Sequence, residues 1–277
     1  MIDLHSHTTA SDGTDAPREL VARAAALGLE ALAITDHDTF TGYEQAAPFA
    51  KEAGLELHRG IELSTRHAGK TVHLLGYFFD APPTQEFQDW VIYMQQSRRD
   101  RNVKLAAKLR SVGVDIELAE VEEIGRSMTG RPHFAQLLMK KGYVTSVQEA
   151  FNVYLGDEAR AHVERESVAL LEAIRNVNAA GGISSLAHPI RLGKRDLAQE
   201  EALISELSEA GLRAIEVWHS DHKPVDSERY ERYARTYHLA VTGGSDFHGF
   251  VKPNIELGTG ASGNLRIPRS VLDALRR

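Results

Sequence analysis

Short apolar runs alternate with amphipathic segments along most of this chain, and this alternation restricts the possible folds more than any other feature. The runs that read as strands are 2–4, 31–34, 57–63, 72–79, 183–186, 214–217 and 239–242. Helical patterns lie between them at 17–27, 43–52, 168–180, 200–210 and 227–237. Strands and helices that alternate in this way predict an α/β fold with a mostly parallel sheet.

The alternation stops between about residues 80 and 164, where the pattern is helical only. One long helix is predicted at about 84–112, with shorter helices at 132–141 and 146–154. We interpret residues 81–163 as a helical insertion that contributes substrate contacts, and residues 1–80 with 164–277 as the domain that holds the sheet. The alternative is two crossover helices joined by a long loop, although such loops are uncommon.

Histidine is abundant and cysteine is absent: 13 of the 277 residues are His and none is Cys. The lack of thiols excludes a disulfide framework, a Cys-type zinc finger, an iron–sulfur cluster and a cysteine nucleophile. The net charge of −7 argues against a protein that coats nucleic acid or a membrane surface. The sequence shows neither a membrane-spanning run nor a secretory signal, so we expect a cytoplasmic enzyme without a DNA or membrane partner.

Many of the histidines and acids stand at the ends of predicted strands. Six segments share this feature: His5-Ser6-His7, Asp36-His37-Asp38, Gly60-Ile61-Glu62, Val72-His73, Ala187-His188 and Gly244-Ser245-Asp246-Phe247-His248. Because the carboxyl ends of parallel strands meet on one face of a sheet or barrel, we expect these side chains to converge there. A lone His in such a place is most often a hydrogen-bonded core residue, but the joint pattern favours a metal site.

Nine side chains are candidate metal ligands: His5, His7, Asp12, His37, Glu62, His73, His188, Asp246 and His248. Imidazole and carboxylate without thiolate suit Mn²⁺, Zn²⁺ or Fe²⁺. This set is too large for one ion and suffices for three ions if one carboxylate bridges two of them. His5 and His7 stand two residues apart, so in a strand they share a face and can hold the same ion.

Together with Ser11-Asp12-Gly13, these motifs resemble those of the PHP (polymerase and histidinol phosphatase) family, in the family's order and over nearly the whole chain. The resemblance implies a distorted (β/α)7 barrel and a site for three metal ions. It implies the following ligand sets: His5, His7, Glu62 and Asp246 for the first ion; Glu62, His73 and His188 for the second; Asp12, His37 and His248 for the third. Many members have His where this chain has Asp12.

Two neighbouring ions lower the pKa of a shared water and clamp the attacking and leaving oxygens of an in-line displacement. We therefore expect a metal-bridging hydroxide as the nucleophile, with Glu62, Asp246 and His188 at the reacting centre. Three divalent ions, three ligating carboxylates and one hydroxide leave a net charge of about +2, which complements a phosphate monoester. Mn²⁺ is the expected ion, with Zn²⁺ or Fe²⁺ as alternatives.

The helical insertion supplies candidate contacts for the rest of a substrate. On the long helix two pairs share a face because their members stand three apart: Arg98 with Arg101, and Arg99 with Asn102. Arg131 and His133 open the next helix, where free N–H groups favour an anion. Arginine-rich helix faces are otherwise most often solvated. As substrate contacts we favour Asp12, Arg99, Asn102, Arg131 and His133.

Some polar residues near the motifs have other candidate roles. Asp36 and Asp38 are candidates to orient ligands or to handle the leaving-group proton. His219 follows a predicted strand and could face the site. The histidines that we expect on the surface or in packing are His58, His67, His162, His222 and His238.

The insertion resembles the branch of the family that includes nucleoside 3′,5′-bisphosphate phosphatases and enzymes acting on short ribonucleotides. This resemblance implies a metal-dependent phosphomonoesterase that releases the 3′-phosphate of a nucleoside 3′,5′-bisphosphate (pAp to AMP). The alternatives are a 5′→3′ exonuclease on short RNA, a histidinol-phosphate phosphatase and a non-catalytic metal-binding regulatory barrel. An amidohydrolase-type barrel is disfavoured, because that class often has a bridging modified Lys at a strand end and this chain offers no candidate.

Overall fold

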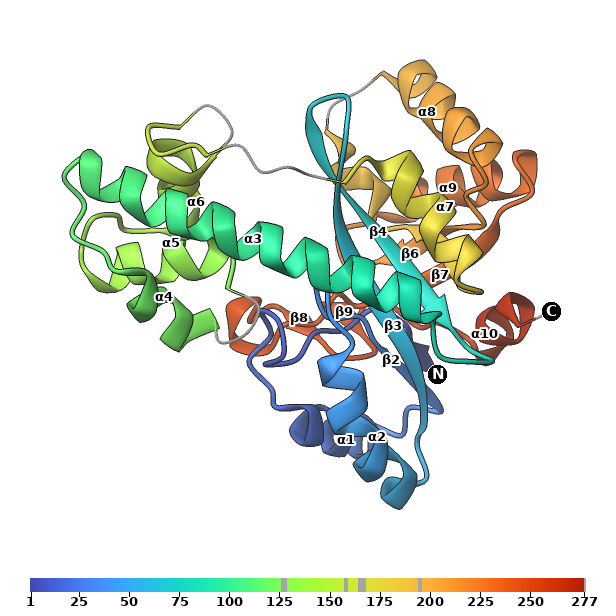
Figure 1. The fold of residues 1–277 in the computed structure, drawn as a ribbon. Coiled ribbons are helices and arrows are strands. Elements are labelled where there is room, and N and C mark those ends of the chain that lie inside the picture. Colours follow the sequence, from blue (N-terminus) through green and yellow to red (C-terminus); the bar gives the residue numbers. More distant parts are fainter. Residues whose placement is uncertain (126–128, 157–158, 164–167, 194–195, 277) are drawn as a thin grey trace.

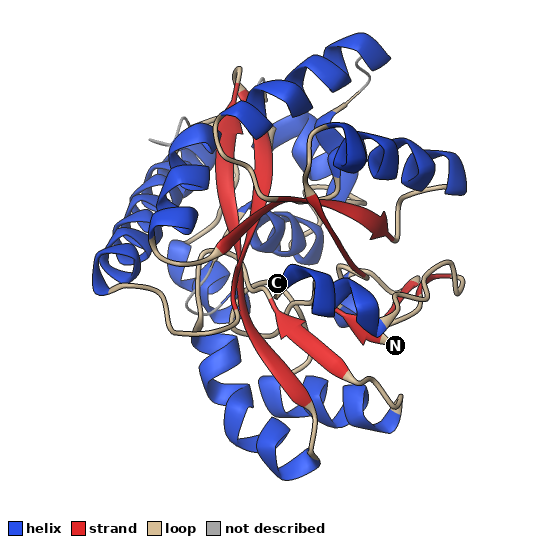
Figure 2. Cartoon of the chain, turned by 90° about the vertical axis from the view of Figure 1, so that its right-hand side faces the viewer, coloured by secondary structure: helices blue, strands red, loops and turns tan. Residues whose placement is uncertain are grey.

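A seven-stranded sheet in sequence order forms the centre of the protein, whose computed structural model describes residues 1–125, 129–156, 159–163, 168–193 and 196–276. The strands are β1 (Ile2–Asp3), β2 (Ala31–Ile34), β3 (Glu56–His67), β4 (Lys70–Phe78), β5 (Ile183–Leu186), β6 (Ala214–His219) and β7 (Ala240–Gly244). Helices surround this curved sheet (Figures 1 and 2). Ala31–Ile34 and Ile183–Leu186 are wholly buried, as expected for strands covered on both faces.

The first strand brings the two edges of the sheet together. β1 pairs in parallel with β2, and the chain just beyond β1 bonds to β7 and the residues that follow it. The Leu4 amide donates to the Gly243 carbonyl over 3.1 Å, and the Asp246 amide donates to the His5 carbonyl over 2.8 Å. The sheet therefore curls into a nearly closed barrel, and the prediction of a distorted (β/α)7-type fold is confirmed.

One strand departs from the parallel arrangement that the alternation predicted. β4 runs antiparallel to both β3 and β5, whereas the other pairs in this sheet are parallel. β3 and β4 are joined by Ala68 and Gly69, which both have positive φ angles, as a tight two-residue hairpin requires. A connection this short cannot cross over the sheet, so the two strands must run in opposite directions.

Six helices cover the barrel within the described part of the chain: α1 (Pro17–Ala26), α2 (Thr41–Ala53), α7 (Leu170–Ala179), α8 (Leu197–Glu209), α9 (Pro224–Thr236) and α10 (Arg269–Leu275). Short elements complete the loops around it: η3 (Pro189–Leu192), η4 (Gly249–Val251), β8 (Ile255–Glu256) and β9 (Gly260–Ala261). α10, β8 and β9 were not predicted, because each is too short to show a clear hydrophobic period. None of the described helices is both long and apolar enough to cross a membrane.

Every described element between β4 and α7 is helical, in the region that the sequence assigns to an insertion. These elements are α3 (Gln85–Ser111), α4 (Leu118–Gly125), α5 (Arg131–Lys140), α6 (Val147–Ala150) and the π-helical turn η2 (Phe151–Leu155). In Figure 1 α3 crosses the barrel and extends beyond it, where α4, α5 and α6 gather around its far half.

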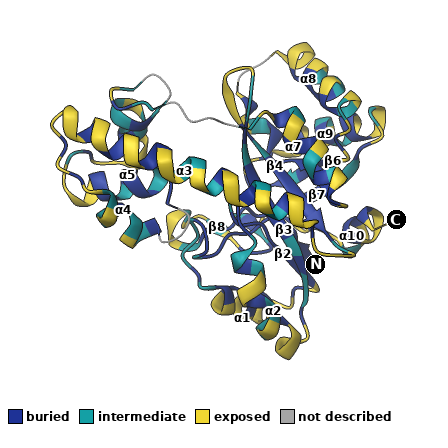
Figure 3. Ribbon diagram, viewed as in Figure 1, coloured by how far each residue is buried: buried dark blue, intermediate teal, exposed yellow. Residues whose placement is uncertain are grey.

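The long helix α3 contributes to two separate hydrophobic cores. Phe87, Val91 and Met94 pack into the barrel core with β3, β4 and α7. Leu105 and Leu109 instead pack into a second core with α4 and α5. Figure 3 shows the buried face of α3 turned toward these partners and an exposed face on the other side. One rigid helix therefore sets the position of the small helical unit relative to the barrel.

We expect Gly244→Ala to destabilise the barrel, because a methyl group there would lie 2.3 Å from both the backbone nitrogen and Cβ of His5. Overpacking of this kind costs about 1–3 kcal/mol, which urea unfolding measures as a lower transition midpoint. Gly181→Asn is the matched control, since Gly181 has a positive φ and open space around it and Asn tolerates that conformation. Equal midpoints for the two variants would contradict the close approach of β1 and β7.

Candidate functional site

The carboxylate of Glu62 lies at the centre of a cluster of imidazole rings. Glu62 is on β3 and is almost wholly buried. Its Oε1 atom lies 2.8 Å from Nδ1 of His73 and 2.9 Å from Nε2 of His188. Its Oε2 atom faces three further ring nitrogens: Nε2 of His7 at 3.1 Å, Nε2 of His5 at 3.3 Å and Nδ1 of His37 at 3.3 Å. Five segments of the chain thus meet at one buried carboxylate.

The antiparallel course of β4 explains how His73 reaches this cluster. Glu62 stands near the end and His73 near the start of a predicted strand, and both lie inside the observed strands β3 and β4. His73 stands near the start of β4, opposite Ser64 on β3. Because β4 runs against its neighbours, its beginning lies at the edge where the parallel strands end, and the side chains still converge.

Asp246 and the two N-terminal histidines form one ligand group with Glu62. Oδ1 of Asp246 lies 3.4 Å from Nε2 of His7 and 3.5 Å from Nε2 of His5. Ser6 forms a bridge to Phe247, so the two ligand-bearing segments run side by side. His5 and His7 stand on either side of Ser6 and both reach the cluster, as the spacing of two predicts for an extended chain.

Asp12 forms a second group with three histidines. Its carboxylate lies 3.2 Å from Nε2 of His248, 3.6 Å from Nδ1 of His7 and 3.7 Å from Nε2 of His37. In the described part of the chain, three sets of ligand atoms lie within 4.8 Å of one another: His5, His7, Glu62 and Asp246; His7, Asp12, His37 and His248; and His37, Glu62 and His73. His188 contacts the Glu62 oxygen that His73 also contacts.

The donor atoms of this cluster suit divalent cations. Nε2 of His5, Nε2 of His7 and Nδ1 of His37 are buried and lack any hydrogen-bond partner. Leaving such atoms unpaired is costly, and a buried ring nitrogen beside a carboxylate is satisfied when both bind the same ion. All three atoms face Oε2 of Glu62. The residues present therefore fit Mn²⁺, Zn²⁺ or Fe²⁺, which prefer imidazole and carboxylate ligands.

Electrostatics keep the carboxylates ionised and several rings neutral. Burial opposes the charge of Glu62, but the neighbouring rings of His37 and His73 outweigh it and hold the pKa of Glu62 well below its usual value. Burial lowers the pKa of His188 to about 3 and that of His37 to about 4. The neutral ring is the form that binds a metal ion. At His7 the carboxylates of Asp246 and Glu62 overcome burial and raise the pKa to about 9.

Asp36 shapes the loop that carries Asp12. Its carboxylate accepts hydrogen bonds from the Thr8 amide (2.8 Å), the Thr8 hydroxyl (2.7 Å) and the Ser11 hydroxyl (2.6 Å). Gly42 permits this arrangement, since a Cβ there would lie 1.8 Å from the Asp36 carboxylate. Asp38 instead accepts from the Ser64 amide and pairs with Arg98. These contacts tie Asp36 to the loop that carries Asp12, and Asp38 to β3 and α3.

Sequence reasoning missed several charged residues around Asp246. Its Oδ2 atom pairs with Nη1 of Arg191 at 2.9 Å and with Nζ of Lys252 at 2.6 Å. His219 does face the site: its Nε2 atom lies 3.5 Å from the same oxygen. Glu216 on β6 is wholly buried beside His5. For Glu216, the sequence signal was an acidic residue inside the apolar run 214–217.

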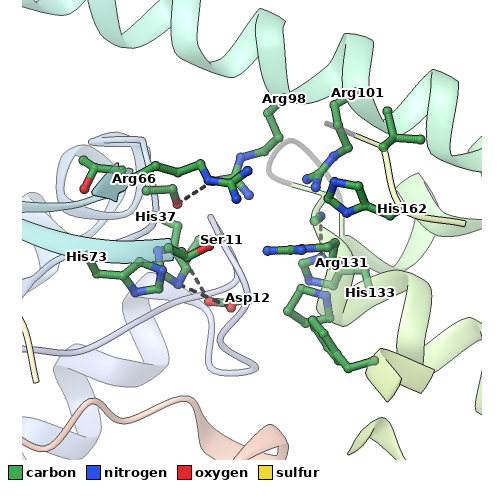
Figure 4. Close-up of a pocket in the computed structure, with 17 residues that line it drawn as sticks. Ser11, Asp12, His37, Arg66, His73, Arg98, Arg101, Arg131, His133 and His162 are labelled. Carbon is green, nitrogen blue, oxygen red and sulfur yellow. Dashed lines mark hydrogen bonds and ion pairs between the residues drawn. The ribbon is translucent and has the colours of Figure 1, made fainter. Parts of the chain in front are cut away.

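A pocket of about 260 Å³ opens between the cluster and the helical unit (Figure 4). The barrel contributes Ser11, Asp12, His37, Ser64, Thr65, Arg66, Thr71 and His73. The helical unit contributes Arg98, Arg101, Gly130, Arg131, Pro132, His133, Phe151, His162 and Val163. In Figure 4 Arg101, Arg131 and His133 approach from the opposite side to Asp12, His37 and His73, whereas Arg66 lies on the barrel side. One wall is thus metal-binding in character and the other is cationic.

Local structure holds the cationic wall in place. The Arg98 guanidinium donates to the Ser64 hydroxyl over 2.8 Å and pairs with Asp38, which ties α3 to the barrel. Arg131 lies over the Phe151 ring, with its guanidinium carbon 5.8 Å from the ring centre. Nδ1 of His133 accepts from the Gly130 amide, so in the neutral ring Nε2 carries the proton and can donate to an anion.

The structure places the two favoured residues of α3, Arg99 and Asn102, outside the lining of this pocket. Arg99 is 59% exposed and pairs with Glu122 outside the pocket. Asn102 is buried, and its amide donates to the Thr129 carbonyl over 2.7 Å instead of lining the pocket. Arg98 and Arg101 line it in their place, since Met94 and Leu105 fix which side of α3 faces inward. His162, expected at the surface, also lines the pocket.

The geometry agrees with the comparisons to known proteins. The family model described as "PHP domain" matches residues 3–248. The chain belongs to the PHP family. A 5′-3′ exoribonuclease of Haemophilus influenzae is 35% identical over 92% of this chain and 92% of its own length. A 3′,5′-nucleoside bisphosphate phosphatase of Chromobacterium violaceum is 31% identical over 89% of this chain and 87% of its own.

A solved structure agrees with this family assignment. It belongs to a protein of Bifidobacterium adolescentis assigned as a metal-dependent phosphoesterase, and it is 32% identical with a TM-score of 0.83. The match covers 99% of this chain and 95% of the other. This PHP chain therefore shares its fold, over nearly its whole length, with a protein whose name implies phosphate-ester chemistry.

We expect Mn²⁺ to raise the melting temperature of this PHP protein, because an ion that binds only the native state stabilises it. At 100 times the dissociation constant one site contributes about 2.7 kcal/mol. Glu62→Gln is expected to lose most of this rise, since Glu62 faces five rings. Glu206→Gln, a half-exposed carboxylate beside His67, is the control. Thermal unfolding with and without Mn²⁺ and EDTA measures the effect, and an equal rise in all three proteins would contradict the site.

Proposed function

We propose that this PHP protein is a metal-dependent phosphomonoesterase that releases the 3′-phosphate of nucleoside 3′,5′-bisphosphates. The observation that carries the proposal is one pocket in which carboxylate and imidazole groups lie opposite a wall that contains three arginines. A substrate with two phosphates needs two anion sites at different places, and this pocket offers both. The similarity to the Chromobacterium violaceum bisphosphate phosphatase supports the same substrate class.

The carboxylate–imidazole wall is the proposed site of the reaction. The nine ligands predicted from the sequence would hold up to three divalent ions, with Mn²⁺ as the proposed ion. Bound there, such ions supply Lewis-acid activation of water and neutralise the charge of the phosphate. Glu62, Asp246 and His188 are the residues of this chain that we place nearest the reacting centre.

The cationic wall is the proposed site of the phosphate that is not cleaved. Arg98 and Arg131 present guanidinium groups, which bind phosphate oxygens in pairs. His133 adds an N–H donor at the start of α5. Arg101 lines the same wall. Its Nε atom donates to Oδ1 of Asn102, which supports the wall without lining the pocket.

The proposed reaction is a hydrolysis in which water is the only co-substrate. The oxygen of water bonds to the 3′-phosphorus, the bond between that phosphorus and the 3′-oxygen breaks, and the 3′-oxygen leaves as a hydroxyl group. Arginines that hold the 5′-phosphate place the 3′-phosphate at the opposite wall. The products are inorganic phosphate and a nucleoside 5′-monophosphate.

A 5′→3′ exoribonuclease is the second candidate, because a relative with that name is 35% identical to this chain. Such an enzyme breaks the same phosphorus–oxygen bond when the 3′-phosphate carries a further nucleotide. Histidinol phosphate fits less well. Its ammonium group calls for acidic partners, whereas the helical wall of the pocket is lined, among the described residues, by three arginines and by no acidic residue.

A substrate panel separates these functions. With Mn²⁺ present, we expect a nucleoside 3′,5′-bisphosphate to yield inorganic phosphate and the 5′-monophosphate with a higher kcat/KM than histidinol phosphate or a nucleoside 5′-monophosphate. Faster release of 5′-mononucleotides from short 5′-phosphorylated RNA would favour the exoribonuclease. Metal binding without turnover of any of these compounds would contradict both.

Neighbouring arginines on α3 provide a matched test of the cationic wall. Arg98→Met is expected to reduce kcat/KM for the bisphosphate by about 10–100-fold, the loss of one charge-assisted hydrogen bond to phosphate. The effect on a nucleoside 3′-monophosphate, which lacks the second phosphate, is expected to be much smaller. Arg99→Met, outside the pocket, should leave both values unchanged. The proposed subsite would be refuted by an unchanged preference for the bisphosphate in Arg98→Met.

A further inference from the structure

Glu216 is a buried carboxylate that lies behind the ligand cluster and contacts two of its members. It belongs to β6 and its side chain has no exposed surface. Oε1 lies 3.0 Å from Nδ1 of His5, on the side of that ring away from Glu62. Oε2 accepts a hydrogen bond of 2.7 Å from the backbone amide of His188. One side chain therefore joins two segments that are far apart in the sequence.

The contact with His5 decides which nitrogen of that ring carries the proton. An ionised carboxylate only accepts hydrogen bonds, so Nδ1 of His5 must donate to Glu216. In a neutral ring the other nitrogen, Nε2, then keeps its lone pair. Nε2 is the buried atom without a hydrogen-bond partner that faces Glu62 and Asp246. The ring is thereby presented in the form that can bind an ion.

The contact with His188 holds a strained piece of backbone. His188 has a φ of 27°, in the left-handed region that non-glycine residues rarely adopt. The residue after it is Pro189, which further limits its conformation. Its amide points at Glu216, and this bond fixes the turn that brings the ring to 2.9 Å from Glu62. Strain of this kind persists only where surrounding contacts enforce it.

We propose that Glu216 is a positioning residue that prepares His5 and His188 together for metal binding, through the tautomer of one ring and the backbone of the other. The inference rests on the proposal that these two histidines hold metal ions. Glu216 is not itself among the ligand groups, because both of its oxygens face N–H donors.

Glu216→Gln tests this with almost no change of shape. The amide has a single acceptor oxygen, and the backbone N–H of His188 can only donate. The oxygen therefore turns to His188 and the NH₂ group turns to His5, where Nδ1 must now accept. The proton of His5 moves to Nε2, which then has no lone pair for an ion. We expect the affinity for Mn²⁺ to fall about 10–100-fold, the usual effect of losing such a supporting contact.

The measurement is Mn²⁺ titration of the metal-free full chain, followed by electron paramagnetic resonance of the free ion. Glu200→Gln is the control, since Glu200 is a buried carboxylate that accepts from Arg229 and Tyr230 and belongs to none of the three ligand sets. It should retain the affinity of the unsubstituted chain even if its melting temperature falls. If Glu216→Gln has a lower melting temperature but binds Mn²⁺ as tightly as the control, the positioning role is wrong. If the unsubstituted chain binds no ion, the metal site itself fails.

A second measurement needs no folded variant at position 216. Long-range ¹H–¹⁵N spectra of the protein saturated with diamagnetic Zn²⁺ report which nitrogen of each neutral histidine ring carries the proton, with the His5 signals assigned by their loss in His5→Gln. We expect a protonated Nδ1 and an unprotonated Nε2 for His5. The opposite tautomer would overturn the inference.

Discussion

The shared carboxylate of Glu62 is the contact on which the site depends. Taking a charge out of water is unfavourable unless opposite charges or hydrogen bonds compensate for it. Five imidazoles from four segments provide that compensation, and His5, His7 and His37 still present ring nitrogens without hydrogen-bond partners. The barrel brings these groups together because six of its seven strands run in parallel and β4 starts at the edge where they end. A strongly polar cluster is thus stable inside an otherwise apolar fold.

The helix α3 connects this cluster to the rest of the proposed substrate site. Its first half belongs to the barrel core and its second half to the helical unit, and the residues that line the pocket stand between the two. Arg98 pairs with Asp38 on the loop after β2, directly beside His37. The distance between the two walls is therefore set by packing on either side of the pocket. This arrangement suits recognition of two phosphates held at a fixed separation.

Much of the fold was predictable because the hydrophobic periods of strands and helices differ. The run at 31–34 and the run at 183–186 are strands with those bounds. The direction of β4 was not predictable from its period, because parallel and antiparallel strands look alike in sequence; the turn at Ala68 and Gly69 decides it. On α3 the helical period did not decide which of two faces lines the pocket. The faces differ only in what they pack against, so the preference for Arg99 over Arg98 had no physical basis before the structure.

The sequence by itself determined the candidate ligands, their order and their places beside strands, because imidazoles and carboxylates at many strand ends are a local pattern. Whether those side chains meet, and which atoms face one another, was decided by tertiary structure. Asp246 and His5 stand more than 200 residues apart and touch only because β1 closes the barrel against β7. Glu216 shows the same limit. It lies within an apolar run, and its role could not be predicted because that role depends on the N–H donors that the fold places around its carboxylate.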